Sequence, residues 1–323
     1  MTRRGWAFVI ISVLFLGMVV IRSVVGTSES ESLTFTGIED GWQESVVEQT
    51  GDGTDKILLL SVEGVIAESE GLNGSFSASK FISQLNQAMD DEDVQAVVIQ
   101  VDSPGGTVVH SEQIHDKIVE VQKSGIPVVV SMGATAASGG YYISAPADVI
   151  VASPSTLTGS LGVIFTIPNL EKAADWIGYS ETRITSGKMK DIGSPLKKIS
   201  DEERQVFQTL VDESYQQFVD VIAKGRNLSK TEVLKLADGR IYSGKQAKKV
   251  KLVDKLGYLE DAIEEAANQI QSDDYTVVQY EDPFSLQSLL GGSFFRSSSD
   301  LNDIVRQVIP VNQYEPQLLY LHD

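Results

Sequence analysis

The chain has 323 residues, a formal net charge of −19 and no cysteine. The missing cysteines exclude disulfides, thiolate zinc sites and cysteine nucleophiles. The negative charge argues against nucleic acid as a partner, because the phosphates would be repelled. With 42% of its residues apolar, the chain has the composition of a globular protein, and its length suggests about two domains.

The N-terminus departs from this globular pattern. Arg3 and Arg4 precede an almost continuous apolar run from Trp6 to Ile21, which is near the lower length limit for a helix that spans a membrane. The two arginines favour an N-terminus in the cytoplasm, so that everything after the run would lie outside it. We expect an uncleaved signal anchor in the cell membrane, with a cleaved signal peptide as the alternative.

Beyond residue 55, apolar runs typical of buried strands alternate with segments of helical periodicity. This alternation predicts βαβ units and a parallel sheet. Strands are expected at 56–66, 94–101, 127–132, 148–152 and 273–282, and helices at 77–89, 110–123 and 201–224, the last with a capping pattern at Ser200 and Glu203.

The composition divides the chain into five parts. The stretch between the apolar run and the first strand is rich in Ser, Glu, Gly, Thr and Asp, which is typical of a linker. We expect a cytoplasmic N-terminus at 1–5, the transmembrane anchor at 6–25, an acidic linker at 26–55, one α/β domain at 56–271 and a C-terminal extension at 272–323.

Ser138 is the leading candidate for a nucleophile. It lies in a run of small residues, Ala136 to Gly140, directly after a predicted strand and at the start of a short helix. In open parallel sheets, ligands gather at the carboxyl ends of the strands. A helix N-cap would explain the serine but not the small residues on both sides of it. Ser131 and Ser144 are weaker candidates.

A second loop, Asp102 to Gly106, follows the preceding strand. Its glycines Gly105 and Gly106 let the backbone approach a substrate and leave amides to point at it. Together with the amide of Gly139, the Gly105 amide is a candidate for an oxyanion hole. A tight turn before a helix is the plain alternative for this loop.

The base that would activate Ser138 is not evident among the three histidines. His110 and His115 fall on the helix after the glycine loop, where capping or facing solvent is the expectation, and His322 is almost terminal. A lysine is therefore the better candidate.

Two lysines, Lys188 and Lys190, lie in a third glycine-containing segment. A lysine base must be neutral, which requires its pKa to fall by roughly three units from about 10.4 through burial without a carboxylate partner. Asp191 follows Lys190 directly, but neighbouring side chains of an extended segment point to opposite faces. A solvated surface charge is the alternative for either lysine.

Several motifs in order resemble those of the bacterial signal peptide peptidase A (SppA) family in its short, single-domain form, over residues 56–271. The motifs are Asp102–Gly106, Ala137–Ser144, Thr158–Ile164, Ser186–Asp191, Asp238–Ala247 and Leu252–Gly257. The resemblance implies a ClpP/crotonase-like α/β fold: repeated ββα units around a twisted, mostly parallel sheet, here preceded by one transmembrane helix.

The same resemblance implies a membrane-anchored serine endopeptidase with a Ser/Lys dyad. Ser138 would be the nucleophile and Lys190 the general base, while Ser160 would orient the lysine. It also implies a homo-oligomeric ring, an octamer by resemblance, in which the dyad is completed across a subunit boundary. The implied substrates are remnants of signal peptides and other apolar peptides, and the lipid bilayer is a partner through the N-terminal helix. No metal or cofactor is implied.

Two further enzymes remain open as alternatives: a ClpP-like Ser-His-Asp peptidase, and a crotonase-like acyl-CoA enzyme that would not need Ser138. A non-catalytic membrane scaffold is a third. The apolar end of the chain, Leu318 to Leu321, resembles a substrate of the expected kind. A packed or disordered tail is the expectation, and docking of this end in a groove, where it would block the site, is the alternative.

Overall fold

The computed structural model describes residues 41–51, 53, 55–68 and 76–281, and the backbone of 319–321. The expected anchor at 6–25 lies outside these residues, as does most of the linker. Within the described part, none of the helices combines the length and the apolar character needed to cross a membrane.

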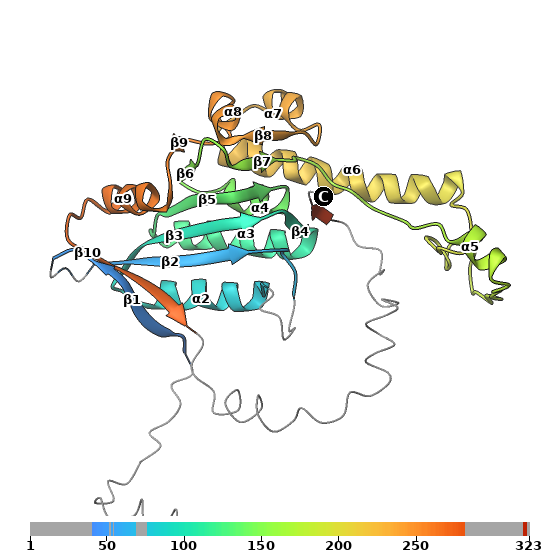
Figure 1. The fold of residues 1–323 in the computed structure, drawn as a ribbon, viewed down its shortest axis with the longest axis horizontal. Coiled ribbons are helices and arrows are strands. Elements are labelled where there is room, and N and C mark those ends of the chain that lie inside the picture. Colours follow the sequence, from blue (N-terminus) through green and yellow to red (C-terminus); the bar gives the residue numbers. More distant parts are fainter. Residues whose placement is uncertain (1–40, 52, 54, 69–75, 282–318, 322–323) are drawn as a thin grey trace, which may run out of the picture. The chain divides into compact units, whose positions relative to one another are not determined.

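A nine-stranded sheet forms the centre of the described part (Figure 1). Its parallel pairs run from β10 through β2, β3, β5 and β6 to β9, and β1 adds an antiparallel edge. The strands in spatial order are β1 (Gln43–Gln49), β10 (Tyr275–Glu281), β2 (Asp55–Glu63), β3 (Val94–Ser103), β5 (Val128–Ala137), β6 (Val149–Ala152) and β9 (Lys255–Leu256). The short strand β7 (Leu157–Gly159) pairs with the end of β5 and with β8 (Ile241–Ser243).

Helices cover both faces of this sheet, which is why the central strands are apolar throughout. One face packs against α2 (Ala78–Asp90), α3 (Val108–Lys123) and α4 (Gly139–Ser144), and the other against α9 (Leu259–Ile270) (Figure 1). The two apolar cores are separate: Leu58, Val97 and Val130 face the first, and Ile57, Val98 and Val129 face the second. The predicted α/β fold with a mostly parallel sheet is confirmed.

Helix α6 (Asp201–Gly225) joins the domain at one end only. Phe218, Val219 and Ile222 near its C-terminus are buried, and Tyr142 of α4 packs on Phe218 with ring centroids 5.1 Å apart. The N-terminal half extends beyond the sheet, with α5 (Glu171–Trp176) and residues 177–200 at its far end (Figure 1). The predicted capping pair of Ser200 and Glu203 is confirmed as a reciprocal capping box. The short helices α7 (Lys230–Leu236) and α8 (Gly244–Lys249) follow α6.

Two strands extend the sheet beyond the range 56–271 that the sequence assigned to the domain. β1 lies in the range assigned to the linker, and β10 lies in the range assigned to the C-terminal extension. β10 joins because Val277 and Val278 bury their side chains as it pairs with β2. β1 joins because its polar, exposed residues can cover the outer edge of β10 without burial.

A tight contact fixes the end of α6 on α4. A Cβ added to Gly225 would lie 2.1 Å from the carbonyl oxygen of Ala145. We expect Gly225→Ala to lower the free energy of unfolding by about 1–3 kcal/mol in urea titrations, because the two backbones would have to separate. Gly162→Ala is the control, since its nearest contact would be 3.8 Å away at Gly239. Equal stability of the two variants would contradict this packing.

Candidate active site

Ser138 has an unusual backbone conformation and a hydroxyl without a partner. It stands between β5 and α4 with φ 52° and ψ −115°, a region that residues with a Cβ rarely adopt. Its side chain makes no capping bond to α4, and its Oγ is buried with no hydrogen-bond partner among the described atoms. The interpretation of Ser138 as an N-cap is therefore wrong. A strained residue with an unsatisfied buried hydroxyl is typical of a functional position.

The turn at Ser138 is fixed from both sides. The Ser138 amide donates to the Gly159 carbonyl at 2.8 Å, which continues the parallel pairing of β5 with β7. On the helix side, the Tyr141 hydroxyl donates to the Leu252 carbonyl at 2.8 Å. A Cβ at Gly140 would lie 2.7 Å from the Ser103 carbonyl oxygen, so only glycine fits there. The small residues that the sequence singled out thus allow α4 to start directly against β3.

Ser160 lies next to this turn. It follows Gly159 in the chain, is 8% exposed and has a φ of 50°. Its amide donates to the Arg240 carbonyl at 2.8 Å. The structure therefore brings Ser160 to the neighbourhood of Ser138, as expected, while its proposed role toward a lysine stays a prediction. A cavity of about 380 Å³ opens beside Ser160, and its lining includes apolar residues such as Leu161 and Val163 as well as Asp212 and Asp238.

The glycine loop lies on the other side of Ser138. A Cβ at Gly139 would be 3.1 Å from both Gly105 Cα and the Gly106 nitrogen. Gly139 therefore contacts both glycines of the loop. The Gly105 amide, however, donates to Ser103 Oγ at 3.1 Å.

Gly106 offers a donor that the candidate list of Gly105 and Gly139 left out. On one edge of β4 (Gly105–Thr107), the Gly105 carbonyl and the Thr107 amide both bond to Ile66, at 2.8 and 2.9 Å. Because successive amides of a strand point to opposite edges, the Gly106 amide faces the other edge. The feature of the sequence that could have indicated this donor is the second glycine of the Gly105–Gly106 pair.

The end of the chain lies along that second edge. The backbone of β11 (Leu319–Leu321) pairs antiparallel with β4, with Tyr320 opposite Gly106 and Leu321 opposite Gly105. The backbone of residues 319–321 therefore docks beside the glycine loop, which is the alternative that the sequence left open.

Lys190 lies elsewhere. Its amide donates to the Gly187 carbonyl at 3.0 Å, so the segment turns here and the expectation of an extended conformation is wrong. The segment lies at the N-terminal end of α6, away from the sheet (Figure 1). The side chain of Lys190 is exposed and forms no ion pair within the described residues, whereas Lys188 pairs with Glu202. Since Ser138 Oγ has no hydrogen-bond partner, Lys190 and Ser138 are not bonded to each other within the described residues.

The histidines of the described part are engaged elsewhere. His110 Nδ1 is 2.6 Å from Thr107 Oγ1, and His115 Nδ1 is 2.9 Å from Asp116 Oδ1. Burial lowers the pKa of His115. His322 lies outside the described residues. The geometry thus gives no support to a Ser-His-Asp arrangement. Ser144 is also excluded as a free nucleophile, because its hydroxyl donates to the Gly140 carbonyl at 2.6 Å.

Comparison with known proteins shows the family of this chain. Residues 120–273 match the model of Peptidase family S49. A protein of Enterococcus faecium, provisionally named signal peptide peptidase SppA, is 38% identical over 293 residues, which cover 87% of this chain and 85% of that protein. Protease 4 of Haemophilus influenzae is 37% identical over 70% of this chain but only 36% of its own length. This chain therefore spans about a third of that relative.

Among solved structures, a ClpP1 mutant from Listeria monocytogenes aligns with a TM-score of 0.42 and 19% identity, covering 65% of this chain and 95% of that chain.

An α/β sheet with a buried, unpartnered serine hydroxyl beside a glycine loop is compatible with a serine peptidase, the class of enzyme to which these relatives point. The chain belongs to peptidase family S49, within which it is similar to SppA. This membership sets aside the acyl-CoA enzyme and the non-catalytic scaffold.

The strain at Ser138 can be measured. Ser138→Ala and Ser138→Gly both remove the hydroxyl, but only the glycine also removes the Cβ that disfavours a φ of 52°. We expect the glycine variant to be more stable than the alanine variant by about 1 kcal/mol in denaturant titrations, even though both are inactive. An alanine variant as stable as the glycine variant would mean that the turn is unstrained.

Proposed function

We propose that this chain is a membrane-anchored serine endopeptidase in which Ser138 is the nucleophile and Lys190 of a second copy is the general base. Its substrates are remnants of signal peptides and other apolar peptides. The observation that carries the proposal is the Ser138 hydroxyl, which is buried, held in a strained turn and without a hydrogen-bond partner. The similarity to SppA supports the choice of substrate.

The segment of residues 171–200, which we call the arm, carries Lys190 and supports completion of the dyad by a second copy. The arm exposes large apolar side chains to solvent: Trp176 is 88% exposed and Ile184 is 96% exposed, and Ile177 is exposed as well. Exposed apolar surface of this kind marks an interaction site. Docking of the arm on a neighbour would cover these side chains and withdraw Lys190 from water, which a neutral amine requires.

The reaction follows from these positions. Neutral Lys190 accepts the proton of Ser138 as Oγ bonds to the peptide carbonyl carbon, and the amides of Gly106 and Gly139 hold the oxyanion, while the Gly105 amide would have to leave Ser103 Oγ to join them. Lys190 then returns the proton to the leaving amine as the C–N bond breaks, which leaves an ester on Ser138. Water attacks the ester and gives its proton to Lys190, and the acyl group leaves as Ser138 is reprotonated.

Substrate binding follows from the edge of β4. An extended peptide that pairs there antiparallel, as β11 does, would place its backbone directly over the glycine loop. The anchor proposed for residues 6–25 would keep the domain at the outer surface of the cell membrane. Released signal peptides are apolar segments of that same membrane environment.

The dyad is tested by removing each partner. Ser138→Ala, Lys190→Ala and Lys190→Arg should each lower kcat/KM on a synthetic signal peptide by ~10³-fold or more, the last because arginine stays charged. Lys198→Met is the control, since it removes a neighbouring exposed lysine. Activity of the Lys190 variants near that of the unmodified protein would refute the proposed base.

Completion by a second copy has its own test. Ser138→Ala and Lys190→Ala proteins, each inactive alone, should regain activity when they are co-assembled, because a mixed boundary unites an intact serine with an intact lysine. If mixing restores nothing while co-purification of the two differently tagged variants shows mixed assemblies, the dyad is not shared between copies.

The docked end of the chain should compete with substrate. Deleting residues 317–323 frees the edge of β4, so kcat/KM should rise at least about twofold while kcat stays the same, since only the competent fraction changes. A synthetic peptide of the deleted residues should inhibit the shortened protein competitively. Unchanged kinetics after the deletion would mean that the tail does not block the site.

A further inference from the structure

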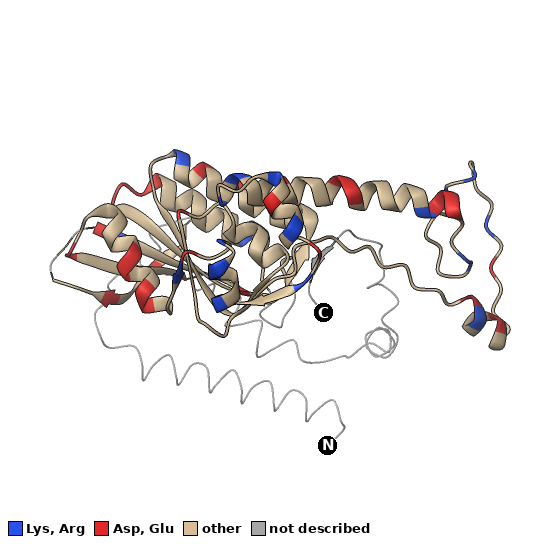
Figure 2. Cartoon of the chain, turned by 90° about the horizontal axis from the view of Figure 1, so that it is seen from above, with Lys and Arg blue, Asp and Glu red and all other residues tan. Residues whose placement is uncertain are grey.

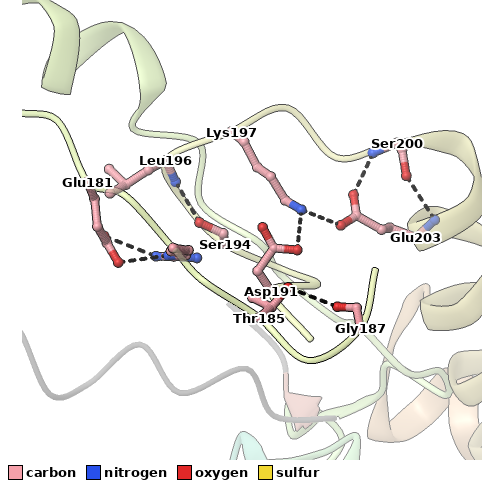
Figure 3. A network of polar contacts seen from close by, with 10 residues as sticks. Glu181, Thr185, Gly187, Asp191, Ser194, Leu196, Lys197, Ser200 and Glu203 are labelled. Atoms are coloured by element: carbon pink, nitrogen blue, oxygen red, sulfur yellow. Dashed lines mark hydrogen bonds and ion pairs between the residues drawn. The ribbon is translucent and has the colours of Figure 1, made fainter. Parts of the chain in front are cut away.

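A network of charges beside Lys190 has no part in the mechanism so far. Lys197 Nζ lies 2.8 Å from Asp191 Oδ1 and 2.7 Å from Glu203 Oε1 (Figure 3). Glu203 is only 4% exposed, and its carboxylate accepts the Ser200 amide at the start of α6 at 2.8 Å. Lys197 therefore ties the residue that follows Lys190 to the first turn of α6.

The ion pair of Lys197 with Asp191 involves the carboxylate that is nearest to Lys190 in the sequence. Lys190 and Asp191 are consecutive residues in a chain of turns, so an extended backbone does not hold their side chains apart. A carboxylate that paired with Lys190 would favour its charged form and oppose its use as a base. In the described residues the carboxylate of Asp191 pairs instead with Lys197, and Lys190 has no ion pair.

The nearby Arg183 already has a carboxylate partner in Glu181. Arg183, whose pKa is raised mainly by Glu181 and to a smaller extent by the charge of Asp191, donates to Glu181 at 2.8 Å. Hydrogen bonds from Lys197 and the Ser200 amide lower the pKa of Glu203 to about 2. The hydrogen bonds of Lys197 to Asp191 and Glu203 raise the pKa of Lys197. Acidic and basic residues both lie at the N-terminal end of α6 (Figure 2). Lys197 thus stays charged, and Glu203 stays ionised, across the working range of a peptidase.

We propose that Lys197 is a positioning residue for the reaction: it holds the carboxylate of Asp191 on the first turn of α6, so that Lys190 reaches the neighbouring copy without a carboxylate partner. This inference rests on the proposed function, because it matters only if Lys190 is the base. If Lys197 had only a structural role, its removal would change stability and assembly but would leave the pKa of Lys190 unchanged.

The pH dependence of kcat/KM on a synthetic signal peptide separates these roles in the full-length protein. Lys197→Met should move the midpoint of the rising limb upward by about one pH unit, with roughly a tenfold loss below it, because Asp191 can then pair with Lys190. Lys197→Arg should keep the original midpoint, and so should the control Lys198→Met. Adding Asp191→Asn to Lys197→Met should bring the midpoint back, since no carboxylate remains to compete.

A second measurement covers the case in which Lys197→Met loses activity through poor assembly. In the Ser138→Ala background, the pH dependence of acetylation of Lys190 by limiting acetic anhydride, followed by mass spectrometry, reports the neutral amine without catalysis. Lys197→Met should move this midpoint upward as well. An unmoved midpoint in both measurements, or an upward shift that Asp191→Asn fails to reverse, overturns the role of Lys197. Full activity of Lys190→Ala would instead overturn the proposed function itself.

Discussion

The site depends on one backbone contact, the bond from the Ser138 amide to the Gly159 carbonyl where β7 extends the pairing of β5. This bond holds Ser138 at a positive φ and sets Ser160 beside it. The strain is compensated by buried packing on the other side of the turn, where Tyr141 and Tyr142 anchor α4 beneath the sheet. A hydroxyl held this way cannot relax into a capping bond, so its hydrogen-bonding capacity stays available for a base and a substrate.

The same packing links the nucleophile to the arm. Tyr142 lies four residues after Ser138 and packs on Phe218 of α6, and α6 carries at its far end the turn that contains Lys190. The C-terminal end of this helix is rigidly docked in the core, while its N-terminal half extends away from the sheet (Figure 1). This arrangement of α6 suits the proposed dyad between two copies. The docked end fixes Lys190 relative to its own domain, and the extended end would bring Lys190 to a neighbouring copy.

The edge of β4 gives the enzyme a way to recognise peptides by backbone alone. Two of its polar groups are already paired with Ile66, and the alternate amide of Gly106 points the other way, toward the strand formed by the end of the chain. Recognition through the backbone tolerates many sequences, and the apolar character of the substrate would then have to be read by side-chain pockets and by nearness to the membrane. The tail shares the apolar sequence of the expected substrates, which explains how it can use the same edge.

The sequence by itself determined the fold class and the central strands and singled out Ser138 and the glycine loop, because apolar runs, small residues and glycines report local backbone requirements directly. It missed the Gly106 amide as a donor and the strand β1, and it expected a strand at 273–282 but left it outside the domain. It also missed the turn at Lys190, although the bond to Gly187 is local. Only the tertiary structure decided the first three, since each depends on a partner distant in the chain: Ile66 for β4, β10 for β1 and β2 for β10. The partner with which a segment pairs cannot be read from the residue pattern of either segment, because the free energy of pairing arises only when the two segments are brought together.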